Sequence, residues 1–267
     1  MSATVITYSL QKGGVGKTTT CGLSAFLLSE MGYKVLAIDM DSQGNLTQLV
    51  SGYDDLEPFY QDTIKEALEF GDINPFIKIA ADNLHYVAAD DYLVLIADYK
   101  GPIPKSTLLQ NAIEKVKSEY DFILIDTPPN LSIQTINALI ASDFVVIMFE
   151  TAKFSYNAIP RFLESIEGAR NNGNPDLKIA GILATLSDSR RNDSKELLAL
   201  SNEEYKELLR LITKNEEKLQ ATFSDEQKEL FSKYTDCVQE FQTISECLLF
   251  QNSFRLGAKI MLEVMEE

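Results

Sequence analysis

The sequence is poor in residues that build several common kinds of catalytic or metal site. Its three cysteines, Cys21, Cys237 and Cys247, have neither metal-ligand nor redox-motif spacing. We therefore expect buried or incidental thiols in a reducing cytosol. His85 is the only histidine, and no serine or cysteine nucleophile motif accompanies it. We expect no catalytic role for this side chain.

Long hydrophobic runs are also absent. The chain has no run of about 18 apolar residues, the length that a transmembrane helix needs. A strand-like segment begins at residue 4, which leaves no room for a secretory signal peptide before it. These observations predict a cytoplasmic protein without a membrane span.

Positive charge is scarce. The chain has 24 basic and 40 acidic residues, for a net charge of −16. Residues 1–194 have a net charge of −10 and residues 195–267 of −6, so neither part has the basic balance of a nucleic-acid-binding protein. A local basic patch stays open, because net charge does not describe distribution. Its candidates are Lys153, Arg161, Arg170, Arg190 and Arg191.

Strand-like and helix-like segments alternate over the first two thirds of the chain. Strands are expected at 4–10, 34–39, 84–88, 121–126, 143–149 and 178–185. Helices are expected at 17–31, 61–70, 106–119, 131–141 and 156–170. This alternation predicts an α/β fold with a doubly wound, mostly parallel sheet. Ligands of such sheets bind at the carboxyl ends of the strands.

A glycine-rich segment joins the first expected strand to the first helix. It consists of Lys12, Gly13, Gly14, Val15, Gly16, Lys17, Thr18 and Thr19. Glycines let a backbone curl so that its N–H groups face phosphate oxygens, and the helix start adds a favourable dipole. The general phosphate-loop pattern places Lys17 at the β- and γ-phosphates and the Thr18 hydroxyl at Mg2+. Gln11 replaces the first glycine of that pattern, and Lys12 is a second lysine inside the loop.

Three motifs resemble those of the ParA/MinD superfamily of ATPases. The segment 12–19 resembles the deviant Walker A loop of that superfamily. The segment Asp39–Asn45 resembles the Asp-x-Asp-x-Gln-Gly-Asn stretch of ParA/Soj partition proteins, and Phe122–Pro129 resembles their Walker B strand and switch. The resemblance covers roughly residues 1–194. It implies a P-loop fold and slow ATP hydrolysis with ATP and Mg2+ as cofactors.

The resemblance also implies a role for each motif residue. The catalytic residues would be Lys12, Lys17 and Asp41, and the metal site would comprise Thr18, Asp39 and Asp126. In the family, the lysine matching Lys12 crosses a two-fold interface to the phosphates of the other subunit. Asp41 aligns with the carboxylate that positions the attacking water, and Thr19 would contact the α-phosphate. Residues 39 and 41 alternate on a strand end, so both can face the site.

The partners implied are a second copy bound through ATP, a ParB-like activator and sequence-non-specific DNA. The implied role is partition of plasmid or chromosomal DNA, or positioning of another cargo. The acidic balance argues against DNA binding. MinD-type relatives end in a basic amphipathic helix, whereas this chain ends in Glu263-Val264-Met265-Glu266-Glu267, so we expect no membrane binding.

Residues 195–267 depart from the family pattern. Two capping-box signatures, Ser201-x-x-Glu204 and Ser224-x-x-Gln227, predict an α-helical hairpin. Soj-like proteins instead carry further strands and helices, which help to hold adenine. The hairpin has an apolar stripe of Ile244, Leu248, Leu249, Leu256, Ile260 and Val264.

Two interpretations of that stripe stay open, namely packing within the chain or a surface for dimerisation or a partner. This C-terminal region also resembles small, acidic, uncharacterised helical proteins. An alternative function follows, in which the chain is a nucleotide-gated interaction protein with little turnover that acts through its helical tail.

Overall fold

The computed structural model describes residues 2–150, 158–185 and 228. The predicted boundary between residues 194 and 195 and the predicted helical hairpin lie outside the described residues and stay predictions.

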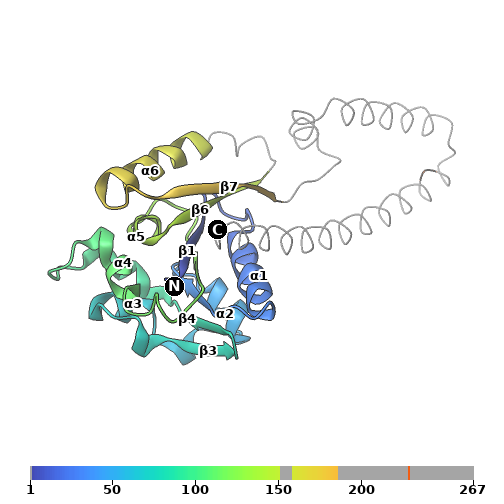
Figure 1. Ribbon diagram of the computed structural model, residues 1–267, viewed down its shortest axis with the longest axis vertical. Helices are drawn as coiled ribbons and strands as arrows, with labels where there is room; N and C mark the ends of the chain where they lie inside the picture. Colours follow the sequence, from blue (N-terminus) through green and yellow to red (C-terminus); the bar gives the residue numbers. More distant parts are fainter. Residues whose placement is uncertain (1, 151–157, 186–227, 229–267) are drawn as a thin grey trace. The chain divides into compact units, whose positions relative to one another are not determined.

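A sheet of seven strands forms the centre of the described fold (Figure 1). The strands are β1 Thr4–Ser9, β2 Val35–Asp39, β3 Lys78–Ala81, β4 Leu84–Val87, β5 Phe122–Asp126, β6 Phe144–Glu150 and β7 Lys178–Thr185. Their spatial order is β3-β4-β2-β5-β1-β6-β7, and β3 with β4 is the antiparallel pair while the other neighbours are parallel. The expected mostly parallel sheet is therefore confirmed.

Helices cover both faces of the sheet (Figure 1). One face carries α1 Lys17–Glu30 and α2 Asn45–Ser51. The other face carries α3 Ile64–Phe70, α4 Leu108–Ile113, α5 Ile133–Ala141 and α6 Ala158–Asn172. Short 3-10 helices lie in the connections: η1 Glu57–Phe59, η2 Asn74–Phe76, η3 Asp91–Asp98 and η4 Lys105–Thr107. The arrangement is doubly wound, as the alternation of segments predicts.

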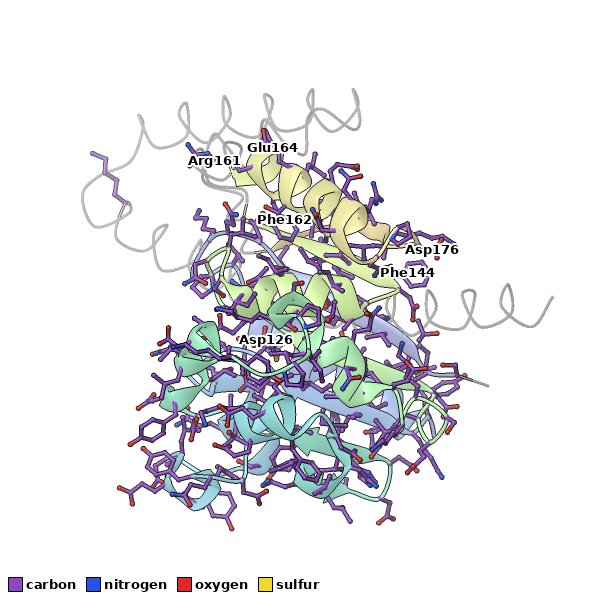
Figure 2. All side chains as sticks on the ribbon, turned by 90° about the vertical axis from the view of Figure 1, so that its left-hand side faces the viewer. Asp126, Phe144, Arg161, Phe162, Glu164 and Asp176 are labelled. Carbon is purple, nitrogen blue, oxygen red and sulfur yellow. The ribbon has the colours of Figure 1, made fainter. Side chains whose placement is uncertain are left out.

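The central strands are buried on both faces. Every residue of β2 and β5 is buried, as expected for parallel strands between two helical layers. The main hydrophobic core lies between these strands and the helices α3, α4 and α5. Phe162 extends this packing from α6, where its fully buried ring points toward the sheet while Glu164 points outward (Figure 2).

Two elements differ from the sequence-based expectation. The helix expected at 106–119 is α-helical only over Leu108–Ile113, and the chain continues in turns in which the Val116 N–H donates to the carbonyl of Ile113. The strand β3 was not expected. It lies at the edge of the sheet, and because three of its four residues are exposed it carries no inward–outward alternation.

None of the helices in the described ranges is both long and apolar enough to cross a membrane.

Candidate functional site

The glycine-rich segment forms the connection from β1 to α1. Gly16 stands immediately before the helix with a φ of 77°, and Gly14 has a φ of 75°. Both values lie in the left-handed region of backbone conformation, which residues with a Cβ atom rarely adopt. Val15 is buried between them, which anchors the loop to the protein. The local sequence thus fixes a tight loop at the start of α1, where unpaired helical N–H groups and the helix dipole favour an anion.

An open cavity of about 560 Å³ lies over this loop. It is lined by Gly13, Gly14, Val15, Gly16, Lys17, Thr18, Thr19, Asp41, Gln43, Asn45, Leu49 and Pro129. The cavity brings together the phosphate loop, the segment after β2 and the segment after β5. Three other predicted site residues, Lys12, Asp39 and Asp126, are not among its lining residues. The last two lie beneath it and act on it through hydrogen bonds.

Lys17 is held at the base of the cavity. Its side chain is 6% exposed, and its Nζ donates a 2.8 Å hydrogen bond to the backbone carbonyl of Lys12. Burial lowers the pKa of Lys17, and the negative charges of Asp126 and Asp41 oppose that shift. The loop therefore positions a cationic head group at the base of the cavity.

Thr18 and Asp126 meet below the loop. The Thr18 hydroxyl donates a 2.6 Å hydrogen bond to Oδ2 of Asp126, which ends β5 in the interior of the protein (Figure 2). The other oxygen, Oδ1, is buried and has no hydrogen-bond partner among the described residues. Burial raises the pKa of Asp126 to about 8, with the neighbouring Asp39 as the second cause. A buried carboxylate oxygen without a donor is uncommon in proteins, and such an atom is suited to bind an ion.

Asp39 ends β2 directly beside Asp126 in the register of the sheet. Its Oδ1 accepts from the Asp41 N–H at 3.0 Å, and its Oδ2 accepts from both the N–H and the hydroxyl of Thr47 at 2.8 Å. Burial raises the pKa of Asp39 to about 6, and the hydrogen bonds from Thr47 oppose this. The family resemblance predicts that Asp39 supports the metal shell, and this stays a prediction. In the structure its two oxygens also hold the backbone between β2 and α2.

Asp41 follows two residues later and lines the cavity. It is 7% exposed, and its Oδ1 accepts from the Gln43 N–H at 3.1 Å. Gly44, with a φ of 64°, then turns the chain into α2. The Gln43 hydrogen bond and the turn at Gly44 therefore hold the Asp41 carboxylate at the cavity wall, across from the phosphate loop.

Sequence reasoning missed Thr47. Its hydroxyl donates to Asp39 and accepts a 2.9 Å bond from the Ala89 N–H, so it joins the ends of β2 and β4 to α2. It is 1% exposed. The only sequence signal is its place in the first turn of a helix that follows the Asp39–Asn45 motif. Gln43, Asn45 and Pro129 also line the cavity. All three lie in predicted motifs; Pro129 is expected to stiffen the switch after β5, whereas Gln43 and Asn45 have no predicted role.

These residues fit a nucleotide with Mg2+. The loop supplies backbone N–H groups and a lysine for phosphates, while Asp126 Oδ1 and the Thr18 hydroxyl supply hard oxygen atoms. Within the described ranges, no three or more His, Cys, Asp or Glu side chains gather into a metal cage. Mg2+ keeps waters and binds one or two protein oxygens plus phosphates, so a small set of protein oxygens suits it.

The remaining candidates lie away from this cavity. His85 Nδ1 shares a 2.7 Å hydrogen bond with the Tyr120 hydroxyl. Arg170 contacts the Glu167 carboxylate and the Leu177 carbonyl, and Arg161 lines a separate hollow between α5 and α6. The other basic candidates, Lys153, Arg190 and Arg191, lie outside the described residues.

Two family models match the chain. Residues 3–179 match a model described as an AAA domain, and residues 183–264 match a family of unknown function (DUF6809). The sporulation initiation inhibitor protein Soj of Bacillus subtilis is 36% identical over 191 residues, which span 70% of this chain and 74% of Soj.

Solved structures agree with these matches. Cobyrinic acid a,c-diamide synthase from Mycobacterium smegmatis, with bound ADP and magnesium, has a TM-score of 0.67 and 29% identity, covering 74% of this chain and 81% of its own. A putative plasmid partition protein from Borrelia burgdorferi bound to AMPPNP has a TM-score of 0.63 and 28% identity, covering 75% and 82% respectively. The motifs, the sheet order and these similarities agree, and the chain belongs to the ParA/Soj family of partition ATPases.

Proposed function

We propose that the protein is a Mg2+-dependent ATPase whose ATP-bound form acts as a switch in DNA partition or cargo positioning. The observation that carries this proposal is the pair formed by Thr18 and Asp126 beneath the phosphate loop, with one carboxylate oxygen that receives no donor from the described residues. The nucleotide-bound structures of relatives support the choice of ligand.

Each residue of the site has a distinct task in this proposal. The N–H groups of residues 13–19 bind phosphate oxygens, and Lys17 neutralises charge on the β- and γ-phosphates. Thr18 would bind Mg2+, Asp126 would hold a Mg2+-bound water and Asp39 would support the metal shell; the ion would supply charge neutralisation. Asp41 orients the attacking water from the cavity wall, while Asp39 fixes the backbone that carries Asp41. Catalysis of this kind depends on positioning and electrostatics rather than on a covalent intermediate.

Lys12 is the residue that would make turnover depend on a second copy. It precedes the exposed glycines of the loop, and its carbonyl already accepts from Lys17. We propose that its side chain reaches the phosphates bound by the partner subunit in an ATP-dependent dimer. Added positive charge stabilises the transition state of phosphoryl transfer, so dimerisation and hydrolysis would be linked.

The decisive test of ligand binding is a thermal shift with ATP and Mg2+. Wild-type protein should gain several degrees, because ligand that binds only the folded state stabilises it. Lys17→Ala should lose this gain while its melting temperature without nucleotide stays near that of the wild type. An unchanged nucleotide-induced gain in Lys17→Ala would remove its phosphate-binding role.

The switch is tested by light scattering with size exclusion. Asp41→Ala blocks turnover in this proposal, so it should form a persistent dimer with ATP and Mg2+ and stay monomeric with ADP. Lys12→Ala should bind ATP with wild-type affinity and stay monomeric. Normal ATP-dependent dimers of Lys12→Ala would contradict the crossing role, and wild-type turnover of Asp41→Ala would contradict the role of Asp41.

Finer features also belong to the proposal. They are a cytoplasmic location, a ParB-like activator and a division into an ATPase domain at 1–194 and a C-terminal region at 195–267. Binding of non-specific DNA is disfavoured by the net charge of −16.

A second function stays in view, because residues 183–264 match a separate family, one of unknown function. In that case the C-terminal region is an effector surface gated by nucleotide, and ATP-dependent dimers would form without measurable phosphate release.

A further inference from the structure

The 3-10 helix η3 exposes three large apolar or aromatic side chains. Side chains three apart eclipse one another in this helix type, so η3 has well-defined ridges. Leu93 and Ile96 form the buried ridge. Tyr92, Val94 and Leu95 stand on the outer ridges with exposures of 54%, 51% and 49%. These side chains are therefore available for contact with another molecule.

An aromatic pair extends this surface beyond η3. Tyr60 follows η1 and is 44% exposed, and its ring meets that of Tyr92 edge to face at a centroid distance of 5.8 Å. We call Tyr60, Tyr92, Val94 and Leu95 the tyrosine patch. Its members come from two segments more than thirty residues apart in the sequence, so the patch is a product of the fold.

Carboxylates surround the tyrosine patch. Partial desolvation raises the pKa of Tyr60, and the next causes are the charge of Asp91, the neighbouring Tyr92 and the charges of Glu57 and Asp90. Asp91 and Glu57 are both exposed. The nearby lysines Lys65 and Lys78 are paired with other carboxylates in this part of the fold.

One carboxylate beneath the patch lacks a partner among the described residues. Asp90 is 1% exposed; its Oδ1 accepts from the Tyr92 N–H at 3.1 Å, whereas its Oδ2 accepts from none of the described donors. Burial raises the pKa of Asp90, and the neighbouring Glu66 raises it further. This buried acceptor adds negative character beneath the acidic, aromatic surface.

The tyrosine patch rests on a fixed support. The Leu93 carbonyl accepts from Gln134 Nε2 of α5 at 3.3 Å, and the Ala89 N–H just before η3 donates to Thr47. A surface that is already ordered loses little entropy when a partner binds. Aliphatic and aromatic contacts with a carboxylate rim match a segment in which lysine or arginine alternates with apolar side chains.

We propose that the tyrosine patch is a docking site for a lysine- or arginine-bearing segment of a partner protein. Cations of that segment stand over the tyrosine rings and pair with the carboxylates, and its apolar side chains cover Val94 and Leu95. This site is separate from the phosphate loop, and its occupation does not depend on ATP turnover.

The experiment uses the full-length protein and a fluorescein-labelled nonapeptide of alternating lysine and leucine, followed by fluorescence anisotropy. A nonapeptide of alternating glutamate and leucine is the charge control. The double variant Tyr92→Ser/Leu95→Ser should bind the lysine peptide about tenfold more weakly, because exposed aromatic and aliphatic anchors carry most interface energy. Asp91→Asn should weaken binding about threefold and reduce its salt dependence.

A matched control removes exposed apolar groups elsewhere. Phe70 and Ile79 are 68% and 74% exposed and lie outside the tyrosine patch, so Phe70→Ser/Ile79→Ser should bind as the wild type does. Melting temperatures confirm that all variants are folded. The proposal is overturned if the lysine peptide does not bind, if the glutamate peptide binds equally well, or if both double variants lose affinity to the same extent.

Discussion

The ends of β2 and β5 look alike in the sequence and differ in the structure. Each strand is buried throughout and ends in an aspartate, and the two aspartates are partners in the register of the sheet. Asp39 accepts from three donors, whereas Asp126 accepts from Thr18 through one oxygen and from none of the described residues through the other. The two motif carboxylates therefore differ in role, because Asp39 holds the backbone whereas Asp126 has an oxygen without a donor among the described residues.

This difference follows from what comes after each strand. Behind β2 the chain turns at once into α2, and the N–H groups of that turn point back at Asp39. Behind β5 comes a segment in which Thr127 donates instead to the Tyr8 carbonyl and Ser9 of β1. The Oδ1 atom of Asp126 consequently receives no donor from the described loop that follows it and keeps unused acceptor capacity.

Asp126→Asn should produce the largest effect. We expect turnover of ATP with Mg2+ to fall about 1,000-fold, or roughly 4 kcal/mol in the activation barrier, because the charged oxygen that would hold a Mg2+-bound water is lost. The amide oxygen introduced by this substitution can still accept from Thr18, so the free energy of unfolding should stay the same or rise. Phosphate release at saturating ATP and urea unfolding measure the two quantities, and wild-type turnover would contradict the assignment.

Asp39→Asn should show the opposite pattern. The amide NH2 cannot accept, so at least one buried N–H of the turn loses its partner, and we expect about 3 kcal/mol less unfolding free energy. Urea unfolding measures the loss, with Asp126→Asn as the matched control at the neighbouring strand end. Equal stability of the two variants would mean that the two aspartates do not differ as the hydrogen bonds indicate.

Thr47→Val should have a smaller effect of the same kind. Valine keeps the shape but removes the hydroxyl, which leaves the Ala89 N–H unpaired and takes one donor from Asp39. We expect a loss of about 2 kcal/mol in urea unfolding. Thr47→Ser retains the hydroxyl and should restore most of that stability; if it does not, the methyl group rather than the hydrogen bonds matters at this position.

Much of the fold could be predicted from the sequence. The parallel strands are continuous apolar runs, and the glycine positions of the phosphate loop match the left-handed backbone at Gly14 and Gly16. The edge strand β3 and the 3-10 helix η3 could not be predicted in the same way, because their patterns follow neither the strand nor the α-helix period. The aromatic pair of Tyr60 and Tyr92 depends on tertiary packing and has no sequence signal.

The candidate site also has features that the sequence could predict and features that it could not. Motif spacing and the family resemblance predict Lys17, Thr18, Asp41 and Asp126 as site residues. The structure brings the first three to one cavity and places Asp126 in contact with Thr18, while their roles stay predictions. Motif spacing could not tell that both oxygens of Asp39 accept hydrogen bonds from the turn and from Thr47, since that depends on where α2 begins. Thr47 was missed for the same reason, because its hydroxyl joins segments that are distant in the sequence.

The pH dependence of stability gives the smallest predicted effect and separates the two aspartates. The folded-state pKa of Asp126 is about 8 and that of Asp39 about 6, both above the ordinary value of 3.8. Each therefore holds a proton in the folded protein at pH values where the unfolded chain has released it, so the free energy of unfolding falls as pH rises toward each folded pKa.

Above pH 6 the ionised form of Asp39 predominates, whereas Asp126 still titrates up to about pH 8. One proton corresponds to a slope of at most about 1.4 kcal/mol per pH unit. Urea unfolding of the nucleotide-free protein at pH 6, 7 and 8 should show a fall of about 1 kcal/mol per unit in the wild type. Asp126→Asn should flatten this fall, because its amide has no proton to lose. A slope that persists in Asp126→Asn would place the titrating group elsewhere and would remove the proposed distinction between the two strand ends.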